Sequence, residues 1–298
     1  MSKEGNIIDV MALSLLIDKI RLSLLKRSGM GGKKKSHAWW TAKGYDCQPE
    51  VSFVLECHNK SLQILHVVEK LRNVPKSEII VIDDGSSMEH SKRLFTSLTG
   101  ANEFVIHAND LFEISTYDKA IRFANADYVV LMQDDDDFHT LDWVTEGLQL
   151  MRKYPRMVIL GGKGARDLKF SDKGYDGSSD VIGDSGKDFR FVPTINRAPE
   201  WINKPLMLEK LKHIDQTFAP FQCDDYEMCC RAWLEGLQVG WYDASFFSLS
   251  PGGMRVYNNS FTAEQLQING RKLFEMYADK MADIRDMVAT ANSKLSRK

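Results

Sequence analysis

The sequence predicts an α/β fold in which a mostly parallel central sheet is flanked by helices. Short apolar runs rich in branched residues alternate with longer stretches whose apolar residues recur at three- and four-residue steps. Polar, turn-forming residues follow the apolar runs, as is usual where strands end. This alternation favours parallel strands with helices on both faces of the sheet. A chain of 298 residues is long enough to bury the core of such a domain.

The expected elements begin at Val51 and alternate through the first half of the chain. Strands are expected at residues 51–55, 78–82, 104–106 and 128–132. Helices are expected at residues 61–71, 87–98, 115–125, 206–214 and 225–234, with a long amphipathic helix from Thr262 onward. Residues 166–200 are rich in Asp, Ser, Gly and Lys and lack clear periodicity, so we expect an irregular segment there. Because ligands of such sheets bind beyond the carboxyl ends of the strands, the polar clusters after these strands are candidates for one site.

Both ends of the chain are expected to form extensions of this domain. Residues 6–27 carry an apolar stripe typical of an amphipathic helix, and residues 28–45 are expected to form a flexible basic linker. The helix could pack on the domain or on a second copy, or it could lie at a membrane surface; acidic residues on its polar face favour a protein contact. The expected organisation is an N-terminal helix and linker at 1–46, the main domain at 47–255 and a helical extension at 256–298.

The composition argues against several classes of protein. The 39 basic and 41 acidic side chains give a formal net charge of −2, so no global positive charge points to nucleic acid. Five cysteines, two of them adjacent, fit neither a zinc site nor a disulfide framework, and a reducing compartment is the simplest interpretation. No segment reaches the roughly 18 apolar residues of a membrane span, and the N-terminal stretch lacks the layout of a signal peptide. We therefore expect a cytoplasmic protein and leave open a peripheral membrane contact through its N-terminal helix.

Four consecutive carboxylates, Asp134–Asp137, follow the expected strand at 128–132 after Gln133. Carboxylates this close repel one another, and a divalent cation would relieve that repulsion. Ligands that are all oxygen suit Mg²⁺ or Mn²⁺, and such an ion could bridge a carboxylate to a diphosphate. The alternative is a solvated acidic loop. The position at a strand end favours a binding site over that alternative.

Two further acidic turns lie at corresponding places. Asp83–Ser86 follows the strand at 78–82, where a carboxylate could accept a hydrogen bond from the N3–H of uracil, a donor that cytosine lacks; an ordinary turn is the alternative. Asp224 and Asp225 stand at the start of the helix expected at 225–234, where acidic residues stabilise a helix terminus. One of them could instead act as a general base that deprotonates a sugar hydroxyl.

Together these motifs resemble glycosyltransferase family 2, whose catalytic domain has the GT-A fold. The similarity covers about residues 50–250 and rests on four motifs in the family's order: 51–59 (VSFVLECHN), 78–86 (EIIVIDDGS), 128–137 followed by Asp142 and Trp143, and 205–215 followed by 224–228. The resemblance implies a metal-dependent enzyme that moves a sugar, with inversion, from a nucleotide-sugar donor to a hydroxyl of a glycan or glycoconjugate acceptor. It implies a UDP-sugar as the donor and Mn²⁺ or Mg²⁺ as the metal.

The resemblance also implies which residues bind the donor nucleotide. Glu56 and His58 fall on the loop that contacts the nucleoside, and Asp84 falls on the aspartate that reads the base. The first loop departs from the family pattern, because Glu56 stands where Pro or Thr is usual and His58 stands where an aromatic residue is usual. Residues 246–255 also lack the late histidine that some GT-A enzymes supply to the metal.

The remaining roles concern the metal and the chemistry. Asp134 and Asp136 fill the two acidic places of the DxD motif, with Asp135 between them. The resemblance makes Asp136 the principal metal ligand and Asp134 a second one, and it places Asp134 and Asp135 against the donor. Asp225 falls on the catalytic base of the family and Asp224 on its acidic neighbour.

Two other functions share parts of this pattern. A sugar nucleotidyltransferase also uses carboxylates at strand ends, but it usually has a Gly-rich phosphate loop after the first strand, and residues 56–60 contain no glycine. A non-catalytic scaffold that binds a nucleotide sugar is the second alternative. The presence of every acidic residue that catalysis requires argues against the scaffold.

Overall fold

The computed structural model describes residues 48–181, 188–249 and 259–295. The chain divides into two compact units, one comprising Met1–Asp46 with Gly100–Asn102 and the other Cys47–Thr99 with Glu103–Lys298. The second unit contains the central sheet and the helices that cover it. The amphipathic helix and basic linker predicted for residues 1–46 lie outside the described residues. Within the described ranges, no helix has both the length and the apolar character needed to cross a membrane.

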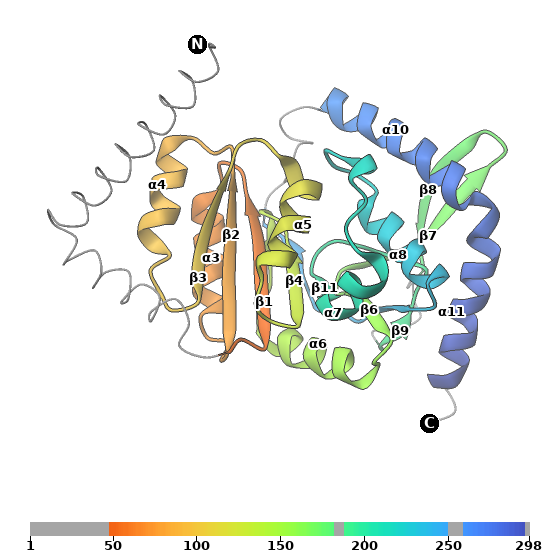
Figure 1. The fold of residues 1–298 in the computed structure, drawn as a ribbon, viewed down its shortest axis with the longest axis horizontal. Coiled ribbons are helices and arrows are strands. Elements are labelled where there is room, and N and C mark those ends of the chain that lie inside the picture. Colours follow the sequence, from red (N-terminus) through yellow and green to blue (C-terminus); the bar gives the residue numbers. More distant parts are fainter. Residues whose placement is uncertain (1–47, 182–187, 250–258, 296–298) are drawn as a thin grey trace, which may run out of the picture. The chain divides into compact units, whose positions relative to one another are not determined.

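The central sheet organises this second unit. Its strands are β1 Val51–Cys57, β2 Ser77–Asp84, β3 Glu103–Ala108, β4 Tyr128–Met132, β6 Met157–Gly161, β9 Arg190–Phe191, β11 Glu200–Asn203 and β12 Gln238–Trp241. Among the described residues these strands lie in the spatial order β3-β2-β1-β4-β11-β6-β12-β9 (Figure 1). β1 pairs in parallel with β2 and with β4, whereas β11 runs antiparallel between β4 and β6. The parallel strands are apolar along their length because helices cover both faces.

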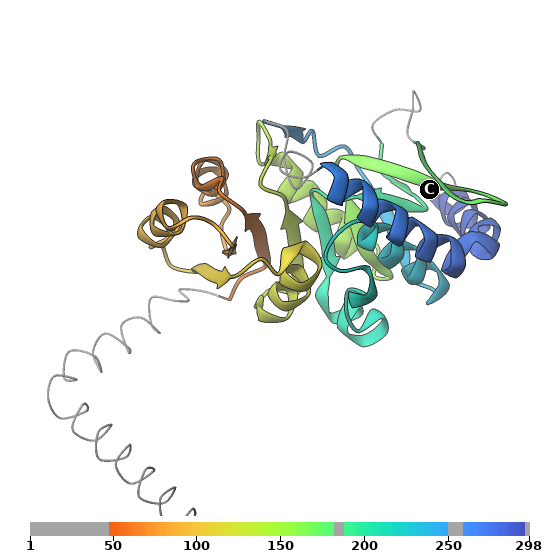
Figure 2. The same cartoon turned by 90° about the horizontal axis from the view of Figure 1, so that it is seen from above.

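The connections between the first four strands reverse direction at β1. The helices concerned are α3 Ser61–Leu71, α4 Met88–Ser97 and α5 Phe112–Phe123. The units β1–α3–β2 and β2–α4–β3 step away from β1 on one side, whereas β3–α5–β4 returns past β1 to its other side. Because such crossovers are right-handed, α3 and α4 cover one face and α5 covers the opposite face (Figure 2). The carboxyl ends of β1 and β4 therefore flank a topological switch point, where open α/β sheets bind their ligands.

The structure confirms the predicted fold class, a mostly parallel central sheet flanked by helices. The predicted ranges 61–71 and 128–132 coincide with α3 and β4. The helix predicted at 206–214 is different, because a short turn α7 Lys204–Leu206 leads into a π-helical turn η1 Met207–Leu211. Lys212, with φ at 74°, ends this segment before residue 214.

The prediction of an irregular segment at 166–200 is wrong. Strands β7 Gly164–Ser171 and β8 Gly174–Asp180 form an antiparallel hairpin, and β10 Thr194–Asn196 pairs with β7. β8 lacks an alternating apolar pattern. It nevertheless forms a strand because backbone pairing with β7 and contact with a C-terminal helix hold it in place. At that contact the ring of Tyr175 lies against Gly270, where a Cβ atom would come within 2.7 Å of the Tyr175 Cδ1 atom.

The second half of the unit is mainly helical. Its helices are α6 Asp142–Lys153, η2 Gln216–Phe218, α8 Asp224–Leu234, α10 Asn259–Tyr277, η3 Ala278–Lys280 and α11 Met281–Leu295. A two-stranded ribbon joins β5 Asp136–Asp137 to β13 Phe247–Ser248. α10 lies beside the β7–β8 hairpin, and α11 contacts α8 and β9 (Figures 1 and 2). The C-terminal helices thus belong to the same compact unit as the sheet.

Candidate active site

Side chains from three parallel strands meet at the switch point. Glu56 lies near the end of β1, Asp84 ends β2, and Asp134 follows β4. Their proximity is expressed in the pKa of Glu56, which burial raises well above its ordinary value. The charges of Glu113, Asp84 and Asp134 raise this pKa further, while that of Arg197 opposes them. Several carboxylates therefore lie close enough to Glu56 at these strand ends to affect its pKa.

Asp84 is buried, and its carboxylate holds the loop between β3 and α5. One oxygen accepts the backbone N–H of Leu111 at 2.9 Å, and the other accepts that of Phe112 at 2.8 Å. Each oxygen keeps lone pairs for a further donor. Asp84 therefore has a structural function in addition to whatever contact it makes with a nucleotide base.

His58 and Asn59 tie the loop after β1 to the loop after β2. The Nδ1 atom of His58 lies 2.7 Å from the backbone oxygen of Asp84, so this nitrogen is the donor. The Nε2 atom then accepts from the amide of Asn59 at 3.0 Å. The backbone N–H of Asn59 donates to Ser86, and Ser87 donates its N–H back to the side chain of Asn59. His58 therefore has both ring nitrogens engaged in fixing the two loops.

Two members of the acidic run, Asp134 and Asp137, form ion pairs with lysines. Asp137 is buried and lies 2.5 Å from the ammonium group of Lys70, with His66 at 3.3 Å. Asp134 pairs with Lys60 at 3.1 Å. Burial raises the pKa of Asp134, and Lys60 opposes that increase. The repulsion expected within the run is thus partly relieved by lysines from α3 and from the residue that precedes it.

Asp136 is the most buried carboxylate of the run, with only 1% of its surface exposed. One oxygen accepts the backbone N–H of Gln133 at 2.9 Å, and the other lies 3.4 Å from the ammonium group of Lys163. Lys163 also donates to the hydroxyl of Ser248 at 2.8 Å, and Ser248 pairs with Asp136 across the ribbon. Burial raises the pKa of Asp136 to about 7, against the opposing charge of Lys163. A further cation beside Asp136 would favour its charged form at neutral pH.

The donor set at this position fits a cation that takes few protein ligands. Among the residues that the structure describes, no cluster of three or more His, Cys, Asp or Glu side chains could enclose a metal ion. Mg²⁺ in phosphate sites commonly takes one or two carboxylates and completes its shell with phosphate oxygens and water. Asp136 and Asp134 match that smaller set, and a divalent ion would stabilise the buried charge of Asp136. These residues therefore fit a metal that binds together with a diphosphate.

Asp225 lies in the first turn of α8. One oxygen of its carboxylate accepts the backbone N–H of Arg197 at 3.2 Å, and the other accepts that of Tyr226 at 2.8 Å. Its side chain is partly exposed, in contrast to the fully buried Asp224. Burial and the charges of Asp224 and Glu200 raise the pKa of Asp225 to about 7, and Arg197 opposes them. A carboxylate with this pKa can accept a proton near neutral pH.

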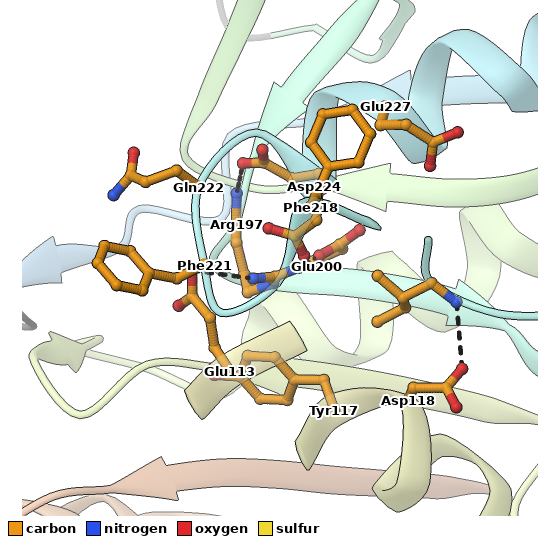
Figure 3. A network of polar contacts seen from close by, with 12 residues as sticks. Glu113, Tyr117, Asp118, Arg197, Glu200, Phe218, Phe221, Gln222, Asp224 and Glu227 are labelled. Atoms are coloured by element: carbon orange, nitrogen blue, oxygen red, sulfur yellow. Dashed lines mark hydrogen bonds and ion pairs between the residues drawn. The ribbon is translucent and has the colours of Figure 1, made fainter. Parts of the chain in front are cut away.

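Arg197 is a buried cation surrounded by carboxylates (Figure 3). Its guanidinium forms an ion pair with Asp224, donates to Glu200 at 2.9 Å and lies 3.9 Å from Glu113. It also lies over the ring of Tyr117, 4.7 Å from the ring centroid. The pKa of Glu113 is raised by burial, with Arg197 opposing the charges of the acidic neighbours.

Tyr117 on α5 contacts both the end of β4 and Arg197. Its hydroxyl donates to the backbone oxygen of Met132 at 2.8 Å, at the end of β4. Burial raises the pKa of Tyr117, and the charges of Glu56, Glu113 and Asp136 raise it further. The charge of Asp225 also raises the pKa of Glu113. Asp135 is partly exposed, with its backbone oxygen accepting from Leu249 at 2.9 Å.

Sequence reasoning missed the network around Arg197, which includes Glu113, Tyr117 and Glu200. Arg197 lies within the segment predicted to be irregular, and Glu113 stands in the first turn of a helix, where an acidic residue needs no further explanation. The partners come from α5, β11 and α8. Glu200 lies three residues from Arg197, whereas Glu113, Tyr117 and Asp224 are distant in the chain, so no local spacing in the sequence predicts their contacts with Arg197.

Removing the Arg197 charge is expected to destabilise the protein strongly. Arg197→Met would leave Asp224 and Glu200 buried without their cation, a change that typically costs about 3–5 kcal/mol. The free energy of unfolding, measured in urea at pH 7, tests this. Arg152→Met is the matched control, because Arg152 pairs with the exposed Glu50 at 2.7 Å and such pairs contribute about 0–1 kcal/mol. Equal losses in the two variants would contradict the assignment of Arg197 as the essential counterion.

The fold and this arrangement of carboxylates define a glycosyltransferase domain of the GT-A type. The model of the family described as "Glycosyl transferase family 2" matches residues 52–236, which is more than half of the chain. The chain belongs to glycosyl transferase family 2. A comparison with curated proteins found no match.

Solved structures share the fold at low sequence identity. TarS 1-349 of S. aureus in complex with UDP-GlcNAc has a TM-score of 0.56 at 13% identity, covering 81% of this chain and 71% of that chain. TarS 1-349 without a named ligand has a TM-score of 0.50 at 13% identity, covering 67% of this chain and 60% of that chain. GalNAc-T7 with UDP, GalNAc and Mn²⁺ has a TM-score of 0.54 at 14% identity, covering 75% of this chain and 48% of that chain. At such identities the similarity concerns the fold.

Proposed function

We propose that the chain transfers a sugar from a UDP-sugar to a hydroxyl of a glycan or glycoconjugate acceptor, with inversion and with the help of Mn²⁺ or Mg²⁺. The observation that carries the proposal is the placement of two carboxylates around the switch point. Asp136 stands in β5, a few residues after β4, and Asp225 stands in the first turn of α8. Both carboxylates have a pKa of about 7. One suits a cation that binds a diphosphate, and the other suits a general base.

The donor side of the proposal uses the ends of β1, β2 and β4. Glu56, His58 and Asp84 would contact the nucleoside, and Asp134 and Asp135 would lie along the diphosphate. This part of the proposal includes the carboxylates of Asp84, Asp134 and Asp136, of which Asp134 pairs with Lys60 and Asp136 with Lys163. A diphosphate placed against carboxylates would be repelled by their negative charge. A divalent cation held by Asp136 and Asp134 would offset the repulsion and neutralise charge on the leaving group.

The acceptor side of the proposal uses Asp225. Its carboxylate would take the proton of the acceptor hydroxyl while the oxygen attacks the anomeric carbon from the face opposite the diphosphate. The backbone N–H groups of Arg197 and Tyr226 fix both oxygens of this carboxylate. Inversion in a single displacement requires no protein nucleophile. Two structures with a similar fold also support UDP as the nucleotide: TarS was solved with UDP-GlcNAc, and GalNAc-T7 was solved with UDP, GalNAc and Mn²⁺.

A panel of nucleotide sugars tests the proposal by thermal shift. UDP-sugars with Mn²⁺ should raise the melting temperature, because a ligand of the native state stabilises it by about 2.7 kcal/mol at 100 times its Kd. CMP-sugars should not, because cytosine lacks the N3–H that Asp84 would accept. The stabilising donor should then release UDP in the presence of acceptor. Release of pyrophosphate from UTP and a sugar phosphate would identify a nucleotidyltransferase instead. A rise in melting temperature with neither sugar transfer nor slow hydrolysis of the donor would identify a binding scaffold.

The predicted contacts of residues 6–27 with a membrane or with a second copy concern the part of the chain outside the described ranges. They stay predictions, as does the cytoplasmic location.

A further inference from the structure

The loop that precedes Asp225 is held from outside by a side chain of the C-terminal helix α10. Asn269 is completely buried, and its amide nitrogen lies 2.7 Å from the backbone oxygen of Phe218, 2.9 Å from that of Phe221 and 3.0 Å from that of Gln222. A buried amide is costly unless its hydrogen bonds are made. Three carbonyl oxygens therefore converge on two N–H donors, so the loop is shaped around this one group.

The orientation of the Asn269 amide is fixed by a neighbour. The ammonium group of Lys272 donates to the oxygen of Asn269 at 3.2 Å and also to the backbone oxygen of Thr217. An ammonium group has no acceptor capacity, so the amide oxygen must face Lys272 and the amide nitrogen must face the carbonyls. The contact thus specifies an asparagine, with its donors and acceptor on opposite sides.

The loop needs such support because its backbone is strained. Gln222 and Cys223 have φ angles of 81° and 69°, in the left-handed region that favours glycine. Residues in this conformation persist only where the surrounding structure enforces them. Asp224 and Asp225 follow directly, so the angle at which α8 begins depends on these two residues.

A second contact links α10 to the loop that the Asp84 carboxylate holds. Phe261, in the first turn of α10, packs edge-on against Phe221 and Phe112, with ring centroids 5.2 and 6.3 Å apart. Phe112 stacks on Phe221 at 5.8 Å, and its backbone N–H donates to the carboxylate of Asp84. One helix therefore touches both the loop before Asp225 and the loop bound to Asp84.

We propose that α10 is a functional part of the acceptor side of the site, and that Asn269 is a positioning residue for Asp225. The inference rests on the proposed function, in which Asp225 takes the proton of the acceptor hydroxyl. Asn269 acts through the loop at 218–223, whose carbonyl oxygens it fixes. Loss of its two donors would let the strained backbone of Gln222 and Cys223 relax and would displace the Asp225 carboxylate from the acceptor.

The test compares Asn269→Asp with Asn292→Asp. The first substitution keeps the shape of the side chain but removes both N–H donors and sets a carboxylate against three carbonyl oxygens. Asn292, on α11, is the matched control because its amide donates to the backbone oxygen of Phe191 at 2.8 Å and accepts the N–H of Phe191 at 2.9 Å. It performs the same kind of backbone contact at β9, the edge strand of the sheet.

We expect Asn269→Asp to lower kcat for transfer by on the order of 10- to 100-fold, with the Kd for UDP and Mn²⁺ unchanged in calorimetry. Hydrogen exchange should accelerate at residues 218–226. Asn292→Asp should lower the melting temperature without changing kcat, and its exchange should accelerate around Phe191. Asn269→Ser, which keeps one donor, should fall between wild type and Asn269→Asp and serves if the aspartate variant does not fold.

The inference is overturned if Asn269 variants that fold match Asn292→Asp in kcat, or if exchange at residues 218–226 is unaffected. Failure of the proposed function has a different signature, because wild-type protein would then transfer no sugar from any UDP-sugar. In that case the exchange measurement still decides whether Asn269 fixes the loop, since it does not depend on turnover.

Discussion

Asp225→Asn is expected to lower the rate of sugar transfer by about 10²- to 10⁴-fold, the range that a positioned general base contributes. An amide cannot accept the proton of the acceptor hydroxyl. Binding of UDP with Mn²⁺ should persist, because the proposal places the donor against Asp84 and Asp136, which stand on β2 and β5, whereas Asp225 stands on α8. Steady-state rates and calorimetry on the same preparation test the two statements together.

The Asp225 carboxylate accepts two backbone N–H groups, and an amide side chain would satisfy only one of them well. Asp225→Ser, which offers a small hydroxyl acceptor, is therefore a necessary companion variant and should be similarly inactive. If either variant that folds and binds UDP keeps more than about a tenth of the wild-type rate, Asp225 is not the base.

The same assignment predicts the pH dependence of the wild-type enzyme. Asp225 has a pKa of about 7, raised by burial and by Asp224 and Glu200, with Glu113 also nearby and Arg197 opposing. The base works only when deprotonated. Activity should therefore fall by about tenfold per pH unit below this pKa and level off above it. A transfer rate that stays constant between about pH 5 and pH 8, a range of one to two units around this pKa, would contradict the assignment of Asp225 as the base.

Asp136→Ala is expected to weaken Mn²⁺-dependent binding of UDP by about 100-fold, which corresponds to about 2.8 kcal/mol. The variant removes the buried carboxylate best placed to hold the cation and frees Lys163, which lies 3.4 Å from it. Binding measured without metal should change much less, because the released ammonium group can itself attract a diphosphate. Calorimetry with UDP, in the presence of Mn²⁺ and then of a chelator, separates the two contributions.

Asp137→Asn is the matched control for Asp136→Ala. Asp137 is the next residue and is also buried, but its carboxylate pairs with Lys70 and His66. Its substitution should lower the melting temperature and leave the metal dependence of UDP binding intact. If Asp136→Ala binds UDP and Mn²⁺ as tightly as Asp137→Asn does, Asp136 does not hold the metal.

The sequence was most informative where structure is local. The strands predicted at 51–55 and 128–132 are mainly apolar because both faces of the sheet are covered, and polar residues follow them at the switch point. α3 was predicted with its observed bounds because its apolar residues follow helical spacing and a proline follows it. These elements suffice to define the fold class and the edge of the sheet that carries the acidic residues.

The rest depends on contacts between distant segments. β8 has no apolar alternation, so only its pairing with β7 and its contact with α10 reveal it as a strand. The pairing of Arg197 with Asp224 and the contact of Asn269 with the loop at 218–222 join residues that share no spacing rule. Side chains of this kind become visible only when the chain is folded.

The amide of Asn269 has a practical consequence for anyone who shortens this polypeptide. A chain cut before residue 259 would keep every acidic residue of the family motifs, yet it would strip the donor from three peptide oxygens and remove the Tyr277 hydroxyl that donates to Glu227 of α8 at 2.9 Å. The C-terminal helices, which lie outside the family motifs, therefore support residues within those motifs, and their removal would disturb α8 and the loop that precedes it.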